Sequence, residues 1–501
     1  MTIHLDPPPV PLEGPLPLSA LRAWIDSAKP LMDSVLLEAA PTDVDGPAAF
    51  LATTALPRLP AACLTRTAQI DTLIAALLRR ARAKFDTNAD APHPTLLCAL
   101  GSYGRRELCP HSDIDLLLLH NPATPAERLK EIISAILTPL WDCGLTATHV
   151  VYAPADIAIL ARRLAALDEA DPAATAVQKQ WTSLLDARPL CANPLTAGEN
   201  DLAAGLTRAC ATFRRDHAFS FARHKAREIA ERHAALHIQP WESPSPGFLE
   251  PNLKDGLGGL RDALATQFIL EALEPADPPA NLPPALSSTR TSLNQARAQI
   301  LAARCLLHGA AGRAQERLLQ GLQPEVIERL LMQLLPDAWS DEPGERLHAG
   351  MALIYDALDR VHLQATAACR RVAQGPRRSR TPTTRQQFDR QNLSVHYSRV
   401  GTELHPTAEG EKALSGPTAL TVALDGCELA LEEQLTPAAN WGELLRDSAA
   451  IANASPPPAA LETFRRILAH PHGLYDLLVW MHRARLLTAL IPEFAGVTAR
   501  T

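Results

Sequence analysis

A Gly-Ser pair and an Asp-x-Asp pair, placed between two apolar runs, constrain this chain more than any other feature. The stretch LLCALGSYGRRELCPHSDIDLLLLH, residues 96–120, holds Gly101 and Ser102 after the first run and Asp113 and Asp115 at the start of the second. Asp113 and Asp115 are two residues apart, so on a strand both side chains face the same way. Because two carboxylates on one face repel each other, the stretch predicts two short strands that carry a cation site.

A hard divalent cation such as Mg²⁺ suits this pair, because it takes oxygen ligands and leaves room for substrate phosphates. The small Gly101-Ser102 pair lets backbone N–H groups approach a phosphate closely. We therefore expect a metal-dependent nucleotidyl-transfer site, in which Asp113 and Asp115 bind metal and Gly101 and Ser102 hold phosphate. The alternative for Asp113 and Asp115 is an Asx turn at the start of a strand.

A third carboxylate on a neighbouring strand is expected to complete the metal site. Asp186 in SLLDARPL is the candidate. Residues 184–190 are predicted to form a short apolar strand, in which a lone Asp is costly to bury. The alternative is a strand-end Asp paired with Arg188.

Length, composition and charge restrict the class of protein. A chain of 501 residues is too long for one core, and its many Ala and Leu residues favour helices. The net charge of −7 gives no general attraction to nucleic acid or to anionic membranes. We also expect no apolar stretch to approach the length of a membrane span.

The nine cysteines are scattered from Cys63 to Cys427 and show no C-x-x-C spacing. This pattern argues against a zinc site and against a disulfide framework. Reduced thiols fit a cytoplasmic protein best.

Changes of pattern along the chain predict its organisation. Alternating strands and helices indicate an α/β domain over 91–200, and helices dominate over 201–370. The basic run near residues 370–380 is either an anion contact or a solvated linker. The remaining expected segments are a flexible Pro-rich lead over 1–17, a helical segment over 18–90, a linker with a small mixed segment over 371–460, and a helical segment over 461–501.

The stretch GSYGRRELCPHSDIDLLLL, residues 101–119, resembles the nucleotidyltransferase signature of the bacterial [protein-PII] uridylyltransferase/uridylyl-removing enzyme family. Three further segments resemble that family in the same order: EPNLKDGLGGLRD at 250–262, RCLLHGAAGRAQERLLQGLQPEV at 304–326, and the tail from 461 to 494. The resemblance implies an α+β, mostly helical fold, with a polymerase-β-like nucleotidyltransferase domain (a small mixed sheet with helices) followed by a helical domain. It also implies transfer of UMP from UTP to a tyrosine of the PII nitrogen-regulatory protein, with release of pyrophosphate.

Lys254 and Arg261 flank the Gly-rich loop of the second matching segment. Cations beside such a loop suit a triphosphate, so both are candidates for nucleotide binding. The alternative is a helix-start loop that carries surface charges.

The chain departs from the family pattern at several positions. Ser102 and Arg106 stand where the family usually has Gly, and the segment from Thr148 to Tyr152 lacks a family Arg. No His-Asp doublet occurs in the chain, and the family's HD hydrolase and ACT domains have no counterpart in it, so we expect no uridylyl-removing activity. The alternatives are a nucleotidyltransferase with another nucleotide or acceptor, and a catalytically weak homologue that binds PII.

Overall fold

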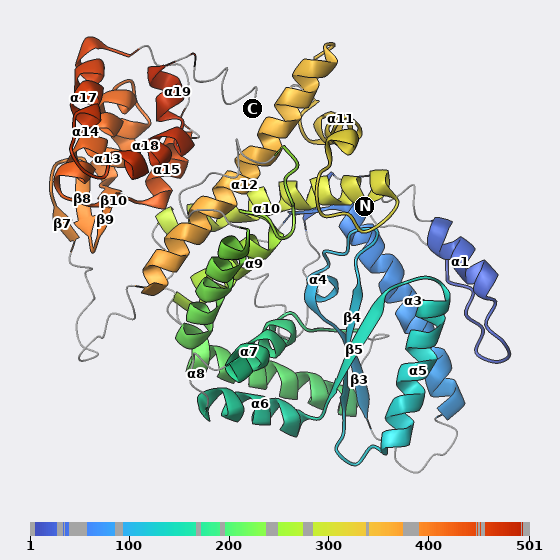
Figure 1. Ribbon diagram of the computed structural model, residues 1–501. Helices are drawn as coiled ribbons and strands as arrows, with labels where there is room; N and C mark the ends of the chain where they lie inside the picture. The colour runs from blue at the N-terminus through green and yellow to red at the C-terminus, as the bar shows by residue number, and fades with distance from the viewer. Residues whose placement is uncertain are drawn as a thin grey trace. The chain divides into compact units, whose positions relative to one another are not determined.

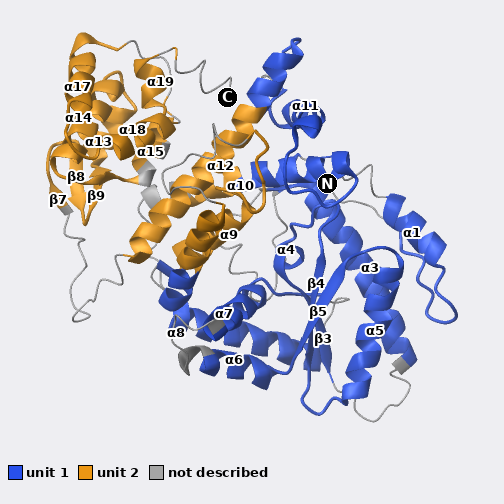
Figure 2. Ribbon diagram, viewed as in Figure 1, with its two compact units in different colours: residues 1–224, 272–276, 297–350 blue, residues 225–271, 277–296, 351–501 orange. Residues whose placement is uncertain are grey.

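The computed structural model describes residues 6–27, 34, 36–39, 58–85, 94–166, 172–190, 196–236, 249–273, 284–336, 340–373, 390–446, 448, 451, 456–491 and 493. The chain divides into two compact units (Figure 2). Unit 1 comprises residues 1–224, 272–276 and 297–350, and unit 2 comprises residues 225–271, 277–296 and 351–501.

Unit 1 is built around a four-stranded mixed sheet with the strand order β5-β4-β3-β6. The strands are β3 Thr95–Ala99, β4 Ile114–His120, β5 Ala147–Tyr152 and β6 Arg188–Pro189. β3 pairs antiparallel with β4 and with β6, whereas β4 and β5 are parallel. The two strands predicted around the Gly-Ser and Asp-x-Asp pairs are thus confirmed as the central pair of this sheet.

Helices surround this sheet (Figure 1). α1, α3 and α5 contribute, with β3 and β4, to one hydrophobic core, because their apolar residues recur at helical spacing and face the sheet. The helical elements that lie wholly or partly in unit 1 are α1 Leu18–Ser27, α3 Ala61–Phe85, α4 Gly101–Gly104, α5 Ala126–Asp142, α6 Pro154–Ala166, α7 Pro172–Leu185, α8 Ala197–Ala235, α10 Pro284–Ala311, the 3₁₀ helix η2 Gln320–Leu322, α11 Gln323–Leu334 and α12 Pro343–Ala373.

The N-terminal region differs in part from the expected all-helical segment. β1 Leu37–Ala39 and β2 Arg58–Pro60 form a two-stranded antiparallel sheet before α3. In the lead, the carbonyls of Asp6 and Pro11 accept hydrogen bonds from Trp24 on α1 and Arg80 on α3. The remainder of the expected helix between residues 28 and 57 lies mostly outside the described residues.

Among the described helices, α3 is long and apolar enough, by length and composition alone, to cross a membrane. The expectation that no stretch approaches that length is therefore wrong for α3. Within Ala61–Lys84, 72% of the apolar 18-residue window is buried inside the protein, and Ile70, Leu73 and Leu77 belong to the core around the sheet. The apolar character of α3 is accounted for by this burial, because a core helix passes the same test as a membrane span.

Unit 2 contains most of α9 and a second four-stranded sheet, with the order β10-β9-β8-β7. Tyr397, Trp441 and Trp480 lie in the hydrophobic core beside this sheet. Within the region expected to be a linker with a small mixed segment, short strands begin at residue 390 and helices follow from residue 408. The elements are α9 Leu260–Leu273, β7 Arg390–Asn392, β8 Tyr397–Val400, β9 Glu403–Pro406, α13 Ala408–Leu414, α14 Ala419–Glu432, β10 Thr436–Pro437, α15 Ala439–Arg446, α17 Pro458–Leu468, α18 Leu474–Arg483 and α19 Leu486–Leu490.

The predicted fold class, α+β and mostly helical, is confirmed: the structure is 67% helical with small mixed sheets. Most of the basic run near residues 370–380 lies outside the described residues.

Candidate functional site

The turn between β3 and α4 brings Gly101 against Asp115. Gly101 has a φ of +55°, and a Cβ added to it would lie 3.4 Å from Asp115 Oδ2. The N–H of Leu100 donates to the carbonyl of Asp115 at 2.9 Å. Only a glycine fits this backbone conformation without strain. Gly101 and the Asp115 carboxylate therefore lie side by side, and a shared site of the Gly-Ser turn and the Asp-x-Asp pair stays a prediction.

Asp115 is held by the neighbouring strand β5. Asp115 and Thr148 are register partners, and the Thr148 hydroxyl donates to Asp115 Oδ1 at 2.6 Å. Asp115 is partly buried, whereas Asp113 is exposed in the residue just before β4. The first-turn N–H groups of α4, including that of Ser102, have no acceptor within the helix and can donate to a phosphate.

Asp186 does not lie on a strand. α7 runs to Leu185 and β6 begins at Arg188, so Asp186 lies in the turn between them. Its side chain is buried and forms an ion pair with Arg105, not with Arg188. Among the described residues, Asp113, Asp115 and Asp186 do not form a group whose ligand atoms all lie within 4.8 Å. A third-ligand role for Asp186 would require its carboxylate to be shared with Arg105.

Arg188 instead fastens the α4 turn to α3. Its guanidinium donates to both carboxylate oxygens of Asp71 at 2.9 and 3.1 Å. It also donates to the carbonyls of Gly104 and Tyr103 at 3.3 and 3.4 Å. Burial alone lowers the pKa of Arg188, but the interaction with Asp71 raises it above its ordinary value. This buried cation therefore stays charged and holds the end of α4 in place.

Gly104→Ala is expected to destabilise unit 1, because a Cβ would lie 2.0 Å from the backbone oxygen of Asp186. Such overpacking costs about 1–3 kcal/mol or more, which denaturant unfolding measures. Gly205→Ala in α8 is the matched control, since nothing lies within 4 Å of its added Cβ. Alanine there should stabilise the helix by about 0.5–1 kcal/mol. Equal stability of the two variants would contradict the close contact at Gly104.

Arg106 adopts a left-handed backbone with a φ of 62°. This conformation favours glycine and strains a longer side chain. Arg106 stands where the family usually has Gly, and its backbone keeps the left-handed conformation that a glycine adopts easily.

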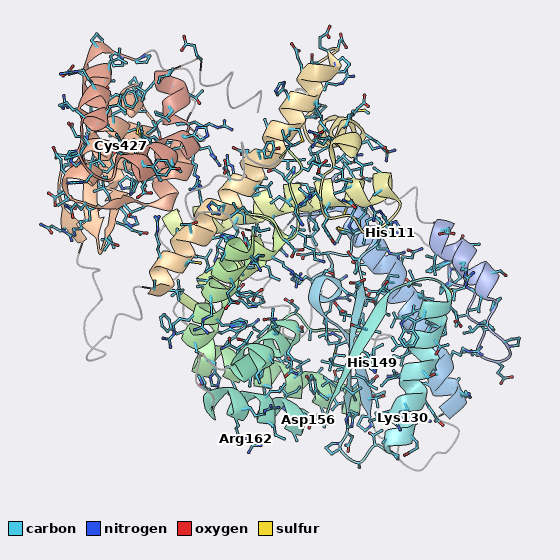
Figure 3. The ribbon with its side chains drawn as sticks, viewed as in Figure 1. His111, Lys130, His149, Asp156, Arg162 and Cys427 are labelled. Atoms are coloured by element: carbon cyan, nitrogen blue, oxygen red, sulfur yellow. The ribbon has the colours of Figure 1, made fainter. Side chains whose placement is uncertain are left out.

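The segment that departs from the family pattern forms β5, at the edge of the sheet (Figure 3). Thr148, His149 and Val150 are exposed on it. The strand ends at Tyr152, and the Asp156 side chain then accepts a hydrogen bond from the N–H of Ala153 at 2.7 Å. The family's Arg is thus missing from β5, the strand whose Thr148 donates a hydrogen bond to Asp115.

Lys254 and Arg261 lie in unit 2, whereas the Gly-Ser and Asp-x-Asp residues lie in unit 1. Arg261 is 55% exposed at its side chain and forms an ion pair with Asp255 at 2.7 Å. Lys254 is partly buried in the turn stabilised by the Asn252 side chain, which accepts from the N–H groups of Lys254 and Asp255. Nucleotide binding by Lys254 and Arg261 stays a prediction.

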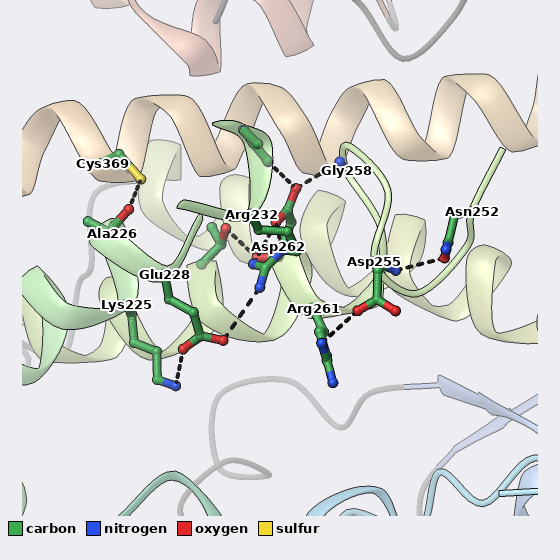
Figure 4. A network of polar contacts seen from close by, with 12 residues as sticks. Lys225, Ala226, Glu228, Arg232, Asn252, Asp255, Gly258, Arg261, Asp262 and Cys369 are labelled. Atoms are coloured by element: carbon green, nitrogen blue, oxygen red, sulfur yellow. Dashed lines mark hydrogen bonds and ion pairs between the residues drawn. The ribbon is translucent and has the colours of Figure 1, made fainter. Parts of the chain in front are cut away.

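Asp262, at the end of the same loop, is the residue that sequence reasoning passed over (Figure 4). Its fully buried carboxylate accepts from Arg232 at 2.8 Å, from His233 at 2.7 Å and from the N–H of Gly258 at 2.9 Å. Burial alone would raise the pKa of Asp262, but His233 and Arg232 hold it below its ordinary value. A Cβ on Gly258 would lie 1.9 Å from the carbonyl oxygen of Leu358. The Gly-rich loop is therefore fixed by internal contacts.

Two families match separate parts of the chain. Residues 61–151 match the nucleotidyltransferase family DUF294, and residues 220–363 match the family described as GlnD PII-uridylyltransferase. The first match covers β3, α4, β4 and nearly all of β5, and the second covers the loop with Asp262.

Several curated relatives carry the name bifunctional uridylyltransferase/uridylyl-removing enzyme. That of Streptomyces coelicolor is 34% identical over 237 residues, which cover 47% of this chain and 24% of the relative. That of Phenylobacterium zucineum is 31% identical over 241 residues, covering 47% and 23%. That of Methylococcus capsulatus is 32% identical over 233 residues, covering 46% and 24%. The chain spans about a quarter of the length of these relatives.

The comparisons and the geometry point to the same segment, in which Gly101 lies against Asp115. The nucleotidyltransferase match contains the whole Gly-Ser and Asp-x-Asp stretch. Through this stretch and the helical segment that follows, the chain is similar to the bifunctional uridylyltransferase/uridylyl-removing enzymes over about half of its length.

Proposed function

We propose that the protein transfers UMP from UTP to a tyrosine of a PII-type regulatory protein and releases pyrophosphate. The observation that carries the proposal is the contact between the Gly101 turn and the Asp115 carboxylate, inside a segment that matches a nucleotidyltransferase family. The names of the curated relatives support uridylyl as the group transferred. PII as the acceptor is supported by the family that matches residues 220–363.

The donor set at the site fits a hard divalent cation. Asp113 and Asp115 supply carboxylate oxygens. Their direct neighbours in sequence, Ser112, Ile114 and Leu116, carry neither sulfur nor imidazole. Mg²⁺ bound there would neutralise the triphosphate charge that opposes attack. The protein's own part is positional: the Gly101 turn admits the phosphates close to the main chain, and Thr148 orients the Asp115 carboxylate.

The transfer requires an acceptor oxygen in line with the bond that breaks. The tyrosine oxygen of PII attacks the α-phosphorus of UTP, the bond to the β-phosphate oxygen breaks, and the tyrosine proton goes to solvent or to a nearby carboxylate. Little covalent chemistry is required of the protein, so catalysis rests on charge and position. We propose Lys254 and Arg261 as additional triphosphate ligands and Asp186 as a third metal ligand, each to be tested by substitution.

Purified chain, PII, Mg²⁺, 2-oxoglutarate and UTP labelled in the α-phosphate are expected to give PII that carries one UMP on a tyrosine. Mass spectrometry of the PII peptide locates the group, and ATP and CTP competed against UTP measure the base preference. Labelling with ATP or CTP alone would favour another nucleotidyl transfer. PII binding without any labelling would favour a catalytically weak, regulatory homologue and overturn the proposal. Incubation of pre-labelled PII with the chain tests separately the expected lack of uridylyl removal.

A further inference from the structure

Three buried thiols meet where three segments of unit 1 come together. Cys63 lies in the first turn of α3, Cys109 lies in the loop between α4 and β4, and Cys305 lies on α10. Cys63 Sγ is 3.3 Å from Cys305 Sγ, which is 3.4 Å from Cys109 Sγ. All three sulfurs lie within 4.8 Å of one another, and none of the side chains is more than 1% exposed. The cluster is separate in chemistry from the carboxylates of Asp113 and Asp115.

The spacing of the sulfurs suits a shared metal ion. A disulfide would hold two sulfurs about 2.0 Å apart and leave the third thiol alone in the core. Three thiolates around a tetrahedral Zn²⁺, with Zn–S bonds of about 2.3 Å, place the sulfurs roughly 3.8 Å apart. A small outward movement from 3.3 and 3.4 Å therefore admits the ion and uses all three sulfurs.

The charge state of the cluster also favours metal binding. Burial opposes ionisation, but hydrogen bonds from Cys305 and Cys63, with Arg304 nearby, bring the pKa of Cys109 well below its ordinary value. Burial keeps the pKa of Cys63 and of Cys305 well above theirs. Cys305 lies between the other two, in sulfur–sulfur contact with both Cys63 and Cys109. Binding of Zn²⁺ would release the thiol protons to solvent as three Zn–S bonds form.

His308 is a second observation that points to a ligand here. It lies three residues after Cys305 on α10, is fully buried, and interacts electrostatically with Cys109. Its Nδ1 accepts from the N–H of His111 at 3.3 Å, whereas its Nε2 makes no hydrogen bond. Burial lowers the pKa of His308 to about 4, so the imidazole is neutral near pH 7, as a metal ligand requires. Its ring nitrogens are not among the ligand atoms that all lie within 4.8 Å of one another, so His308 borders the cluster and would have to move to become a fourth ligand.

We propose that Cys63, Cys109 and Cys305 bind one thiophilic metal ion, Zn²⁺ in the first instance, which fixes the loop that leads to Asp113. This loop already contains a tight turn, in which the N–H of Cys109 donates to Ser112 Oγ at 3.1 Å and the N–H of Ser112 donates to the Cys109 carbonyl at 3.0 Å. Asp113 follows directly, so an ion at Cys109 restrains a predicted catalytic residue from four positions away.

The test is metal analysis of the full chain, purified under reducing conditions and dialysed against a weak chelator. We expect one Zn²⁺ per chain by mass spectrometry. After replacement with Co²⁺, the near-ultraviolet charge-transfer absorption should have the intensity of three thiolates. Asp115→Ala should retain both signals, which separates this ion from a cation at the carboxylate site.

Cys109→Ala is expected to lose the ion and the charge-transfer band. Cys210→Ala, which removes a buried thiol that donates to the Leu184 carbonyl at 3.6 Å, should keep both. The wild-type measurement stands by itself if the cluster variant fails to fold. A wild-type chain without tightly bound Zn²⁺, Co²⁺ bound without thiolate absorption, or a native disulfide between two of the three cysteines would each overturn the proposal.

Discussion

Asp115→Asn should lower the rate of nucleotidyl transfer by a factor on the order of 10²–10³ while the chain stays folded. Asparagine keeps the size of the side chain and an oxygen that accepts from Thr148, which now donates at 2.6 Å. The substitution removes the charge that would attract Mg²⁺ and the triphosphate. Initial rates of UMP incorporation at saturating UTP and Mg²⁺ measure the effect, and circular dichroism confirms the fold.

Thr148→Val is the matched control, because it removes the hydrogen bond and leaves the carboxylate. A residue that only orients a metal ligand typically accounts for about 10–100-fold in metal affinity or activity. Asp186→Asn completes the set: as a third metal ligand Asp186 predicts a loss close to that of Asp115→Asn. Retained transfer with reduced stability would assign Asp186 to its ion pair with Arg105 alone. Wild-type transfer by Asp115→Asn would refute the proposed site.

Asp262→Asn is expected to lower the local unfolding free energy of unit 2 by about 1–3 kcal/mol, because it removes the nearer of the two carboxylates that pair with Arg232 and leaves only Glu228 at 3.4 Å. The Asp262 carboxylate joins α8 to the Gly-rich loop through Arg232, His233 and the N–H of Gly258. Amide hydrogen exchange in α9 is the suitable measurement, since a chain with two units need not unfold in one step.

Asp255→Asn controls for the loss of one carboxylate in the same loop. The side chains of Asp255 and Arg261 are 37% and 55% exposed, so the loss of their ion pair should cost no more than about 1 kcal/mol.

The pKa of Asp262 is held below its ordinary value. The stabilisation that the Asp262 carboxylate gives the folded state is therefore present above the unfolded-state pKa of about 3.9, and it is lost as the pH falls through the lower, folded-state pKa. The difference between wild type and Asp262→Asn should therefore shrink in acid. A difference that persists undiminished at pH about 2 would exclude this ion pair as its cause.

The part of the site that is local in sequence could be predicted from sequence. β3 and β4 both lie within residues 95–120, so the two apolar runs predict both strands, whereas the short helix α4 between them was not predicted. The partner of Asp115 could not be predicted in this way, because Thr148 is 33 residues away and its role depends on the register of β4 against β5. Sequence reasoning also assigned charged residues of the 250–262 loop to nucleotide and overlooked the structural role of Asp262.

The region of Asp186 was assigned wrongly because a short apolar run fits a strand or a helix end equally well. Val177, Trp181 and Leu184 are buried at helical spacing, and this signal, read from residue 172 onward, would have extended the helix to Leu185. The three-cysteine cluster was missed for another reason. Cys305 lies 242 residues from Cys63 and 196 from Cys109, whereas spacing rules for zinc sites detect ligands that are close in sequence.

The ion pair between Arg188 and Asp71 has a consequence for how a nucleotide meets this protein. Because Arg188 already fixes the last carbonyls of α4 to α3, the turn that we propose to hold the phosphates has little freedom to lose on binding. The ordering entropy that a loose loop would give up at that moment is already lost on folding. Most molecules therefore already have this turn in its binding conformation before a nucleotide arrives. The measured dissociation constant for a nucleoside triphosphate should then lie close to that of the binding-competent state alone.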